Sequence, residues 1–453
     1  MTRFSAVTPA LRGHIPGAVV VASAGAAGAA AVLFDWGVAE RAGIIAAACV
    51  VLWLGELVPV WVPTAMLWVA TPLLLATSDA AFSPARVLGW SIDPVLALFL
   101  GGFAIAAAAS AQGVDRAVAA LALRLSRGQP VRLVVLVGLT TAILSMWMSN
   151  VAAAALMLAA LRPVLEGDTS STGSLRRPLL LAIALAADVG GIATPVGTGS
   201  NGIAMAALEP THPTSFIQWM LFGVPLAFGL LAAALAVIVW RTRPAGVIGV
   251  ASGAPLHLTA QTWHLAAVFS ATVLLWLTEP LHGVRAWVVA LGAVAVLVVA
   301  RLIRWHDVRR MDWSTLLLIA GGIALGALLD QSGLVREGAS HIHFAGVPPF
   351  LGLFGLCLAS ALLSAVMSNT ATAAFLVPLA LTLDPTPSTA IIVAVSTSLG
   401  VPFVISTPPN AMAVGTGLLR SRELLAPGLL IMLGGCMLVA LTGPAVLRAF
   451  GIP

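Results

Sequence analysis

Long apolar runs, separated by short polar loops, alternate along the whole chain. The runs are about 17–25 residues long, which is the length of a helix that crosses a lipid bilayer. The pattern predicts an all-α polytopic membrane protein with about eleven spans. These spans are expected at 16–34, 42–56, 60–77, 93–111, 178–208, 218–240, 263–279, 285–300, 313–330, 389–419 and 427–449.

Two further apolar blocks, 131–165 and 348–383, do not fit a simple alternation of crossings. Arg residues flank the first block on both sides, so a single crossing would leave one Arg cluster outside. Two full crossings would leave almost no loop between them. We therefore predict a re-entrant hairpin that enters from the cytoplasm, with its tip near Ser149 and Asn150. The second block has few Arg residues at its flanks and predicts a hairpin that enters from outside.

The Arg residues also set the orientation of the chain. Arg3 and Arg12 precede the first span, and loops rich in Arg mark the cytoplasmic side of polytopic proteins. We expect a cytoplasmic N-terminus and a location in a bacterial-type cytoplasmic (inner) membrane.

Composition supports a membrane protein and excludes several other classes. The chain is 60% hydrophobic and 9% charged, whereas soluble domains carry about 25% charged residues. The net charge is +5, but the Arg residues sit in short loops without interleaved aromatic residues, so nucleic acid is not an expected partner. The three Cys residues lie in apolar runs and have neither disulfide nor metal-ligand spacing.

Motifs of the first half recur in the second half in the same order. "AILSMWMSNVAAAA" (142–155) aligns with "ALLSAVMSNTATAA" (361–374), and "GIATPVGTGSNGIAM" (191–205) pairs with "GVPFVISTPPNAMAV" (400–414). "GGFAIAAAASAQGVDR" also aligns with "GGIALGALLDQSGLVR". Three collinear matches that include polar residues make chance similarity a poor explanation. The Arg loops give the two copies opposite orientations, and inverted repeats with broken helices are the architecture of secondary transporters.

The repeat divides the chain into five predicted parts. They are N-terminal scaffold helices, a first repeat, linking scaffold helices, a second repeat and a C-terminal helix, at 1–92, 93–208, 209–311, 312–422 and 423–453.

Four polar breaks interrupt the apolar pattern, namely the hairpin tips at 149–151 and 368–370 and the segments "GTGSN" (197–201) and "STPPN" (406–410). Broken helices at membrane depth are tolerated only where they are buried or line a cavity. Backbone N–H groups and hydroxyls at such breaks bind anions, and carbonyl, hydroxyl and Asn oxygens suit Na⁺. The breaks therefore predict one anion site and two cation sites. Polar contacts that merely join helices are the simpler explanation for a single Asn, but not for a repeated Ser-Asn pair.

One ionisable residue, Asp188, lies inside a predicted span, close before the first segment break. Carboxylates within the membrane are costly and mark ion or proton pathways. Asp188 is thus a possible coupling residue, either adding cation affinity or carrying a proton. A structural pair with a hydroxyl or a water is an equally good explanation.

These motifs resemble the divalent anion/sodium symporter (DASS) family, within the wider ion-transporter superfamily. That family has paired Ser-Asn-Thr motifs at its hairpin tips and Thr/Pro/Asn loops in two broken helices. The likeness extends over nearly the whole chain, including "LWLGELVPVWVPTAML" (52–67). It implies a homodimer that moves small anions by an elevator motion.

The resemblance also assigns roles to individual residues. Substrate is expected at Ser149, Asn150, Val151, Thr198, Ser368, Asn369, Thr370, Thr407 and Pro408. One Na⁺ is expected at Ser145, Ser149, Asn150, Gly197 and Gly199, and another at Ser364, Met367, Asn369 and Ser406. Val151 departs from the family pattern, because it replaces the Thr of the first motif and removes a hydroxyl from the anion site.

We therefore expect a Na⁺-coupled carrier of divalent anions such as succinate, malate, citrate or sulfate, with Na⁺ as coupling ion and no other cofactor. The alternative is a dicarboxylate exchanger or an H⁺-coupled anion carrier with the same fold. An enzyme is not expected, because the eight His residues form no metal-type cluster. A channel or receptor would have continuous helices and no inverted repeat.

Overall fold

The computed structural model describes residues 14–55, 57–166, 169–245, 259–334 and 348–452. These residues form α-helices joined by short turns and 3-10 segments, with no strand among them. The predicted all-α fold class is confirmed. Arg3 and Arg12, which set the predicted orientation, lie outside the described residues.

The helices of the first half follow the predicted spans closely. They are α1 (His14–Leu33), α2 (Val38–Leu54), α3 (Trp61–Leu75), α4 (Pro84–Trp90), α5 (Pro94–Ala111), α6 (Val114–Leu125), α7 (Pro130–Ser145), α8 (Asn150–Leu165), α9 (Thr169–Gly190), α10 (Gly199–Leu208) and α11 (Phe216–Thr242).

The second half continues the same pattern. Its helices are α12 (Ala260–Leu277), α13 (Glu279–His282), α14 (Ala286–Val299), α15 (Trp305–Val308), α16 (Trp313–Gln331), α18 (Pro349–Ser364), α19 (Asn369–Leu383), α20 (Pro387–Thr397), α21 (Pro408–Gly415) and α22 (Ser421–Ala449).

Four of the described helices lie outside the predicted spans and hairpins, namely α4, α6, α13 and α15. The basic segment with Arg116 and Arg124 forms the amphipathic helix α6. The short helix α4 begins with Pro84 at its first turn, where the missing N–H of proline costs nothing.

Length and composition alone qualify five of the described helices as membrane spans: α5, α11, α12, α16 and α22. Shorter apolar helices include α7, α8, α18 and α19, which are the four hairpin arms. Short arms are what a re-entrant hairpin requires, because neither arm needs to cross the whole bilayer.

Both interrupted spans are broken as the sequence predicted. α9 is followed by the 3-10 segment Gly191–Ala193 before α10 begins, and α20 is followed by the 3-10 segment Val404–Ser406 before α21. Residues 178–204 and 389–402 are buried throughout, so these two spans form the centre of the molecule.

Two glycines allow each hairpin to pack closely on its interrupted span. A Cβ on Gly190 would lie 2.5 Å from the Ala142 carbonyl oxygen in α7, and a Cβ on Gly400 would lie 2.5 Å from that of Ala361 in α18. Any larger residue would push the hairpin away from the break.

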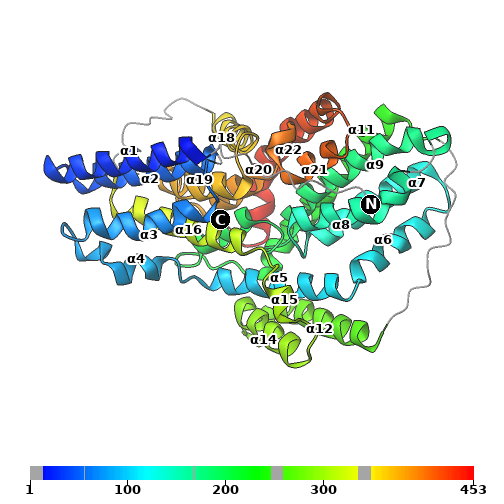
Figure 1. Cartoon of the computed structure of the whole chain (residues 1–453), viewed down its shortest axis with the longest axis horizontal. Coiled ribbons are helices and arrows are strands. Elements are labelled where there is room, and N and C mark those ends of the chain that lie inside the picture. The colour runs from blue at the N-terminus through cyan, green and yellow to red at the C-terminus, as the bar shows by residue number, and fades with distance from the viewer. Residues whose placement is uncertain (1–13, 56, 167–168, 246–258, 335–347, 453) are drawn as a thin grey trace.

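The two repeats interlock at their broken spans. α9 packs mainly on α7, α8 and α11, whereas α10 packs on α16, α19 and α20 of the other repeat. α21, in turn, packs on α8 and α9. In Figure 1, α1 to α3 lie at one end of the long axis and α6 to α8 at the other. The interlock brings all four breaks to the middle of the molecule.

Candidate functional site

Four helices begin at the walls of one cavity of about 250 Å³. They are α8, α10, α19 and α21, and the residues preceding them are Ser149, Thr198, Ser368 and Thr407. All four of these N-cap residues line the cavity. Because a helix N-terminus carries roughly half a positive charge, the four ends together present a charge of about +2 to this space.

Three of the four N-cap hydroxyls hold the start of their own helix. Ser149 Oγ accepts a hydrogen bond from the Ala152 amide at 3.3 Å, and Ser368 Oγ accepts one from Ala371 at 3.1 Å. Thr407 Oγ1 accepts a bond from the Asn410 amide at 3.4 Å. The family resemblance assigned these hydroxyls to substrate, and Ser149 to Na⁺ as well, but they also cap the helices whose N-termini face the cavity.

The structure brings all the residues predicted for substrate to this cavity. Its lining includes Ser149, Asn150, Val151, Thr198, Ser368, Asn369, Thr370, Thr407 and Pro408. Of the residues predicted for Na⁺, Gly197, Gly199 and Ser406 also line it, together with the shared Ser149, Asn150 and Asn369. Ser145, Ser364 and Met367 do not line it and are buried.

Oxygen atoms cluster around the Asn150 side chain. One terminal atom of its amide lies 2.9 Å from Ser145 Oγ and 3.2 Å from the carbonyl oxygens of Ala187 and Gly197. Ser145 Oγ also donates to the Ala187 carbonyl at 2.6 Å. These are the residues predicted for the first Na⁺, joined by Ala187, which the sequence did not single out.

The second predicted Na⁺ cluster repeats part of this arrangement. Ser364 Oγ donates to Asn369 Oδ1 at 2.8 Å, just as Ser145 approaches Asn150. Ser406 Oγ donates to the Ala365 carbonyl at 2.9 Å. Hydroxyl, amide and carbonyl oxygens are therefore grouped behind both hairpin tips.

The cavity contains acidic groups but no basic one. Of the described residues that line it, Asp188 and Asp312 are carboxylates and none is Arg or His. Asp188 is fully buried, and Thr407 Oγ1 donates to its Oδ2 at 2.8 Å. Asp312 caps α16 and accepts from the Thr315 amide at 3.1 Å.

Several lining residues were not predicted, among them Val60, Asp312, Ser314 and Thr315. Asp312, Ser314 and Thr315 follow an Arg-rich loop and carry no motif, and Val60 lies in the stretch 52–67, for which the sequence predicts no binding role. Packing of α16 against α3 and α19 brings these segments to the cavity.

Asn201 and Asn410 brace the breaks. Asn201 Nδ2 donates to the carbonyls of Gly191 and Thr194 at 2.9 and 2.8 Å. Asn410 Nδ2 donates to those of Val401 and Phe403, each at 3.0 Å. All four asparagines of the chain lie at the four breaks, two binding-site candidates and two braces, which is a signal that the sequence already contained.

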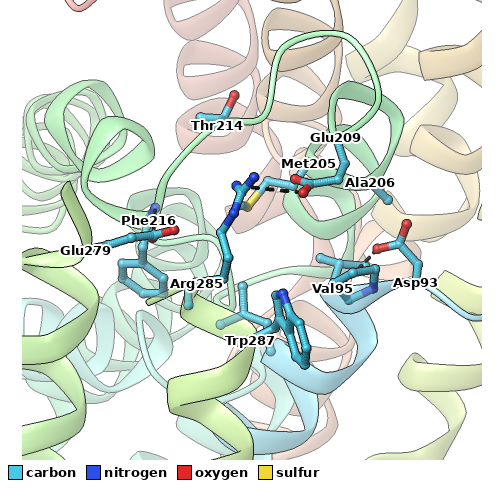
Figure 2. A pocket seen from close by; sticks show the side chains of 13 residues that line it. Asp93, Val95, Met205, Ala206, Glu209, Thr214, Phe216, Glu279, Arg285 and Trp287 are labelled. Carbon is cyan, nitrogen blue, oxygen red and sulfur yellow. Dashed lines mark hydrogen bonds and ion pairs between the residues drawn. The ribbon is translucent and has the colours of Figure 1, made fainter. Parts of the chain in front are cut away.

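A second cluster of charged groups lies away from the cavity, where α10 ends and α14 begins (Figure 2). Glu209 and Arg285 form an ion pair at 3.7 Å, with Asp93 and Glu279 nearby. Burial raises the pKa of Glu209; Arg285 lowers this pKa, and the neighbouring carboxylates add to the rise. The cluster holds three carboxylates and one Arg, so the ion pair neutralises only part of its negative charge.

Comparison with known proteins gives several matches. A family model described as citrate transporter (CitMHS) matches residues 50–390. An uncharacterized transporter of Haemophilus influenzae is 30% identical over 427 residues, which cover 87% of this chain and 88% of the relative. The sodium-dependent dicarboxylate transporter SdcS of Staphylococcus saprophyticus is 26% identical, over 86% of this chain and 82% of the relative. The inorganic phosphate transporter PHO87 of Saccharomyces cerevisiae is 27% identical over 76% of this chain, but only 39% of PHO87 is covered.

A solved structure shares the fold. The crystal structure of the YdaH transporter of Alcanivorax borkumensis superposes with a TM-score of 0.56 at 18% sequence identity. The match covers 78% of this chain and 85% of YdaH.

Proposed function

Because the chain belongs to the citrate transporter (CitMHS) family, a family of membrane transporters and not of enzymes, we propose that it carries divalent anions by Na⁺-coupled symport. The proposed substrates are di- and tricarboxylates such as succinate, malate and citrate, with sulfate as a further candidate. This agrees with the resemblance to the DASS family found in the sequence, and a relative, SdcS, is a sodium-dependent dicarboxylate transporter.

The charge balance of the cavity carries this proposal. Four helix N-termini supply a charge of about +2, which matches a dianion. Two carboxylates line the same space, and no Arg or His does so among the described residues. A bound dianion therefore leaves a negative excess unless cations bind with it, and the oxygen clusters behind both hairpin tips provide places for them.

A thermal-shift screen identifies the substrate, because a ligand that binds the folded state raises its stability. Succinate, malate, citrate, sulfate and phosphate are each added in NaCl and in choline chloride at equal ionic strength. We expect at least one carboxylate to raise the melting temperature in NaCl only. An equal rise in melting temperature in both salts argues for exchange or H⁺ coupling. A rise with phosphate alone would indicate inorganic phosphate as the substrate, as the name of PHO87 states for that relative.

Val151 is expected to influence the choice of anion. It is 40% exposed, lines the cavity and occupies the position that Thr370 has in the second repeat. Val151→Thr restores a hydroxyl of similar size, and a hydrogen bond to a charged partner is worth about 1.5–3 kcal/mol. We predict a change of about tenfold or more in the relative affinities of the anions, measured by competition in the thermal-shift assay. An unchanged ranking would show that this position faces away from the anion.

We further propose that the chain works as a homodimer by an elevator motion, in which the repeats 93–208 and 312–422 carry the site past the remaining helices. The positive-inside rule places Arg309 and Arg310, and with them the Asp312 end of the cavity, on the cytoplasmic side. Glu209, which directly follows α10 of the moving part, and Arg285, which directly precedes α14 of the scaffold, then lie on the opposite side and form an ion pair there.

Linking these two positions is expected to stop transport. Glu209→Cys and Arg285→Cys are combined in a chain whose native cysteines, all buried and unpaired, are replaced. We predict that a flexible bifunctional thiol reagent blocks uptake in the double variant, because the elevator step must separate these residues. Each single-Cys variant treated with the same reagent is the matched control. Uptake by the crosslinked double variant at the untreated rate would contradict an elevator step at this interface.

A further inference from the structure

Asp188 is the fully buried carboxylate at the cavity, and it lacks a basic partner. None of the ion pairs among the described residues includes it. Its neighbours are Thr407 Oγ1, which donates at 2.8 Å, and the Asn150 amide, 3.5 Å from Oδ1. An uncompensated carboxylate at membrane depth is costly, so it calls for a positively charged partner.

The Asn150 amide is surrounded in a way that points to that partner. When the amide oxygen points toward Ser145, it faces the carbonyl oxygens of Ala187 and Gly197. The Ser145 hydroxyl donates its proton to the Ala187 carbonyl. With the amide turned by 180°, its oxygen instead lies 3.5 Å from Asp188 Oδ1. In the turned orientation the NH2 group donates to Ser145 Oγ and to the carbonyls of Ala187 and Gly197, so the amide is satisfied while Asp188 Oδ1 loses its hydrogen bond from Asn150. Oxygens about 3.4 Å apart are the neighbours expected around a cation with ligands at roughly 2.4 Å.

The second repeat has no carboxylate at the corresponding place. Since Gly191 aligns with Gly400, Asp188 aligns with Thr397. Thr397 is buried, and its hydroxyl donates to the Ala394 carbonyl at 2.7 Å and lies 3.0 Å from Ser200 Oγ. The oxygens grouped around Ser364 and Asn369 are neutral. The two cation clusters are therefore alike in their hairpin residues and different in charge.

We propose that Asp188 is the charged member of the first Na⁺ site, so that this site binds Na⁺ without substrate, whereas the neutral second site binds Na⁺ only when the anion is present. This inference rests on the proposed Na⁺-coupled transport. Asp188 makes the two cation sites unequal in charge and therefore determines which site binds Na⁺ first.

The test is a Na⁺ titration of the thermal stability of the purified full chain without anion, at constant ionic strength with choline chloride. The wild type should show a saturable rise. Asp188→Asn keeps the side-chain shape and should increase the half-saturating Na⁺ concentration at least tenfold, whereas Asp188→Glu should retain most of the response. Ser364→Ala is the matched variant of the neutral site and should keep the anion-free response. An Asp188→Asn titration equal to wild type overturns the inference.

A measurement on the wild type alone keeps the inference testable if the Asp188 variants do not fold. Binding of radioactive Na⁺ should give one ion per protomer without anion and two with a saturating anion. Two ions per protomer without anion would overturn the inequality of the sites. A wild type that does not distinguish Na⁺ from choline in either assay would instead overturn the Na⁺ coupling proposed above.

Discussion

Asn150→Ala and Asn369→Ala are each expected to reduce anion uptake by about a hundredfold or more while leaving a folded protein. Each residue is the first of its helix, α8 or α19, and each lines the cavity that these helices face. Each amide also approaches a hydroxyl of a predicted cation cluster, at 2.9 Å for Ser145 and 2.8 Å for Ser364. Removing a group that serves both anion and cation loses about 3 kcal/mol, which corresponds to roughly a hundredfold.

The measurement is uptake into proteoliposomes, combined with gel filtration and melting in detergent. Both side chains are only partly buried, so we expect elution and melting temperature close to those of the wild type. Normal uptake by both variants would refute the site. Uptake lost together with the melting transition would show that the residues stabilise the hairpin tips.

Asn201→Ala and Asn410→Ala are expected to act in the opposite way, through stability. Both side chains are fully buried, and each amide donates to two carbonyls at its break. The carbonyls of Thr194 and Phe403 also accept from the amides of Gly197 and Ser406, so the side-chain donor that alanine removes is not replaced in this way only at Gly191 or Val401, at a cost of about 1–3 kcal/mol. We predict a loss of about 1–3 kcal/mol and a melting temperature lower by several degrees.

This pair of variants is the matched control for the first pair, because it removes the same kind of side chain from the other two of the four breaks. The contrast is measured by melting all four variants with and without Na⁺ and anion. Asn201→Ala or Asn410→Ala protein that melts like the wild type but binds no anion would move these residues from the bracing role to the binding site.

The elements of the transporter core could be predicted from the sequence because their polar residues are repeated. α7 ends at Ser145 and α8 begins at Asn150, so the hairpin tip predicted from two Arg-rich flanks is placed to within a residue or two. The breaks at "GTGSN" and "STPPN" also lie where Gly and Pro interrupt the helical pattern. Local chemistry determines these features, and local chemistry is visible in a sequence.

What could not be predicted depends on packing. Asp312 and Thr315 follow an Arg-rich loop and carry no motif, but the position of α16 brings them to the cavity. The amphipathic helix α6 is shorter than a membrane span and contains Arg residues, so the span pattern that predicts the apolar helices does not reveal it. The sequence predicts no separate role for Asn201 and Asn410, the last residues of the two break motifs. Spacing alone does not distinguish a side chain that binds its own backbone from one that binds a ligand.

The central claim, transport of a divalent anion coupled to Na⁺, is tested most directly by uptake of labelled succinate or citrate into proteoliposomes with an imposed inward Na⁺ gradient. Na⁺-coupled symport predicts accumulation above equilibrium that collapses when the gradient is dissipated and is absent when choline replaces Na⁺. Uptake that ignores the Na⁺ gradient but requires anion inside the vesicles would contradict it and identify an exchanger.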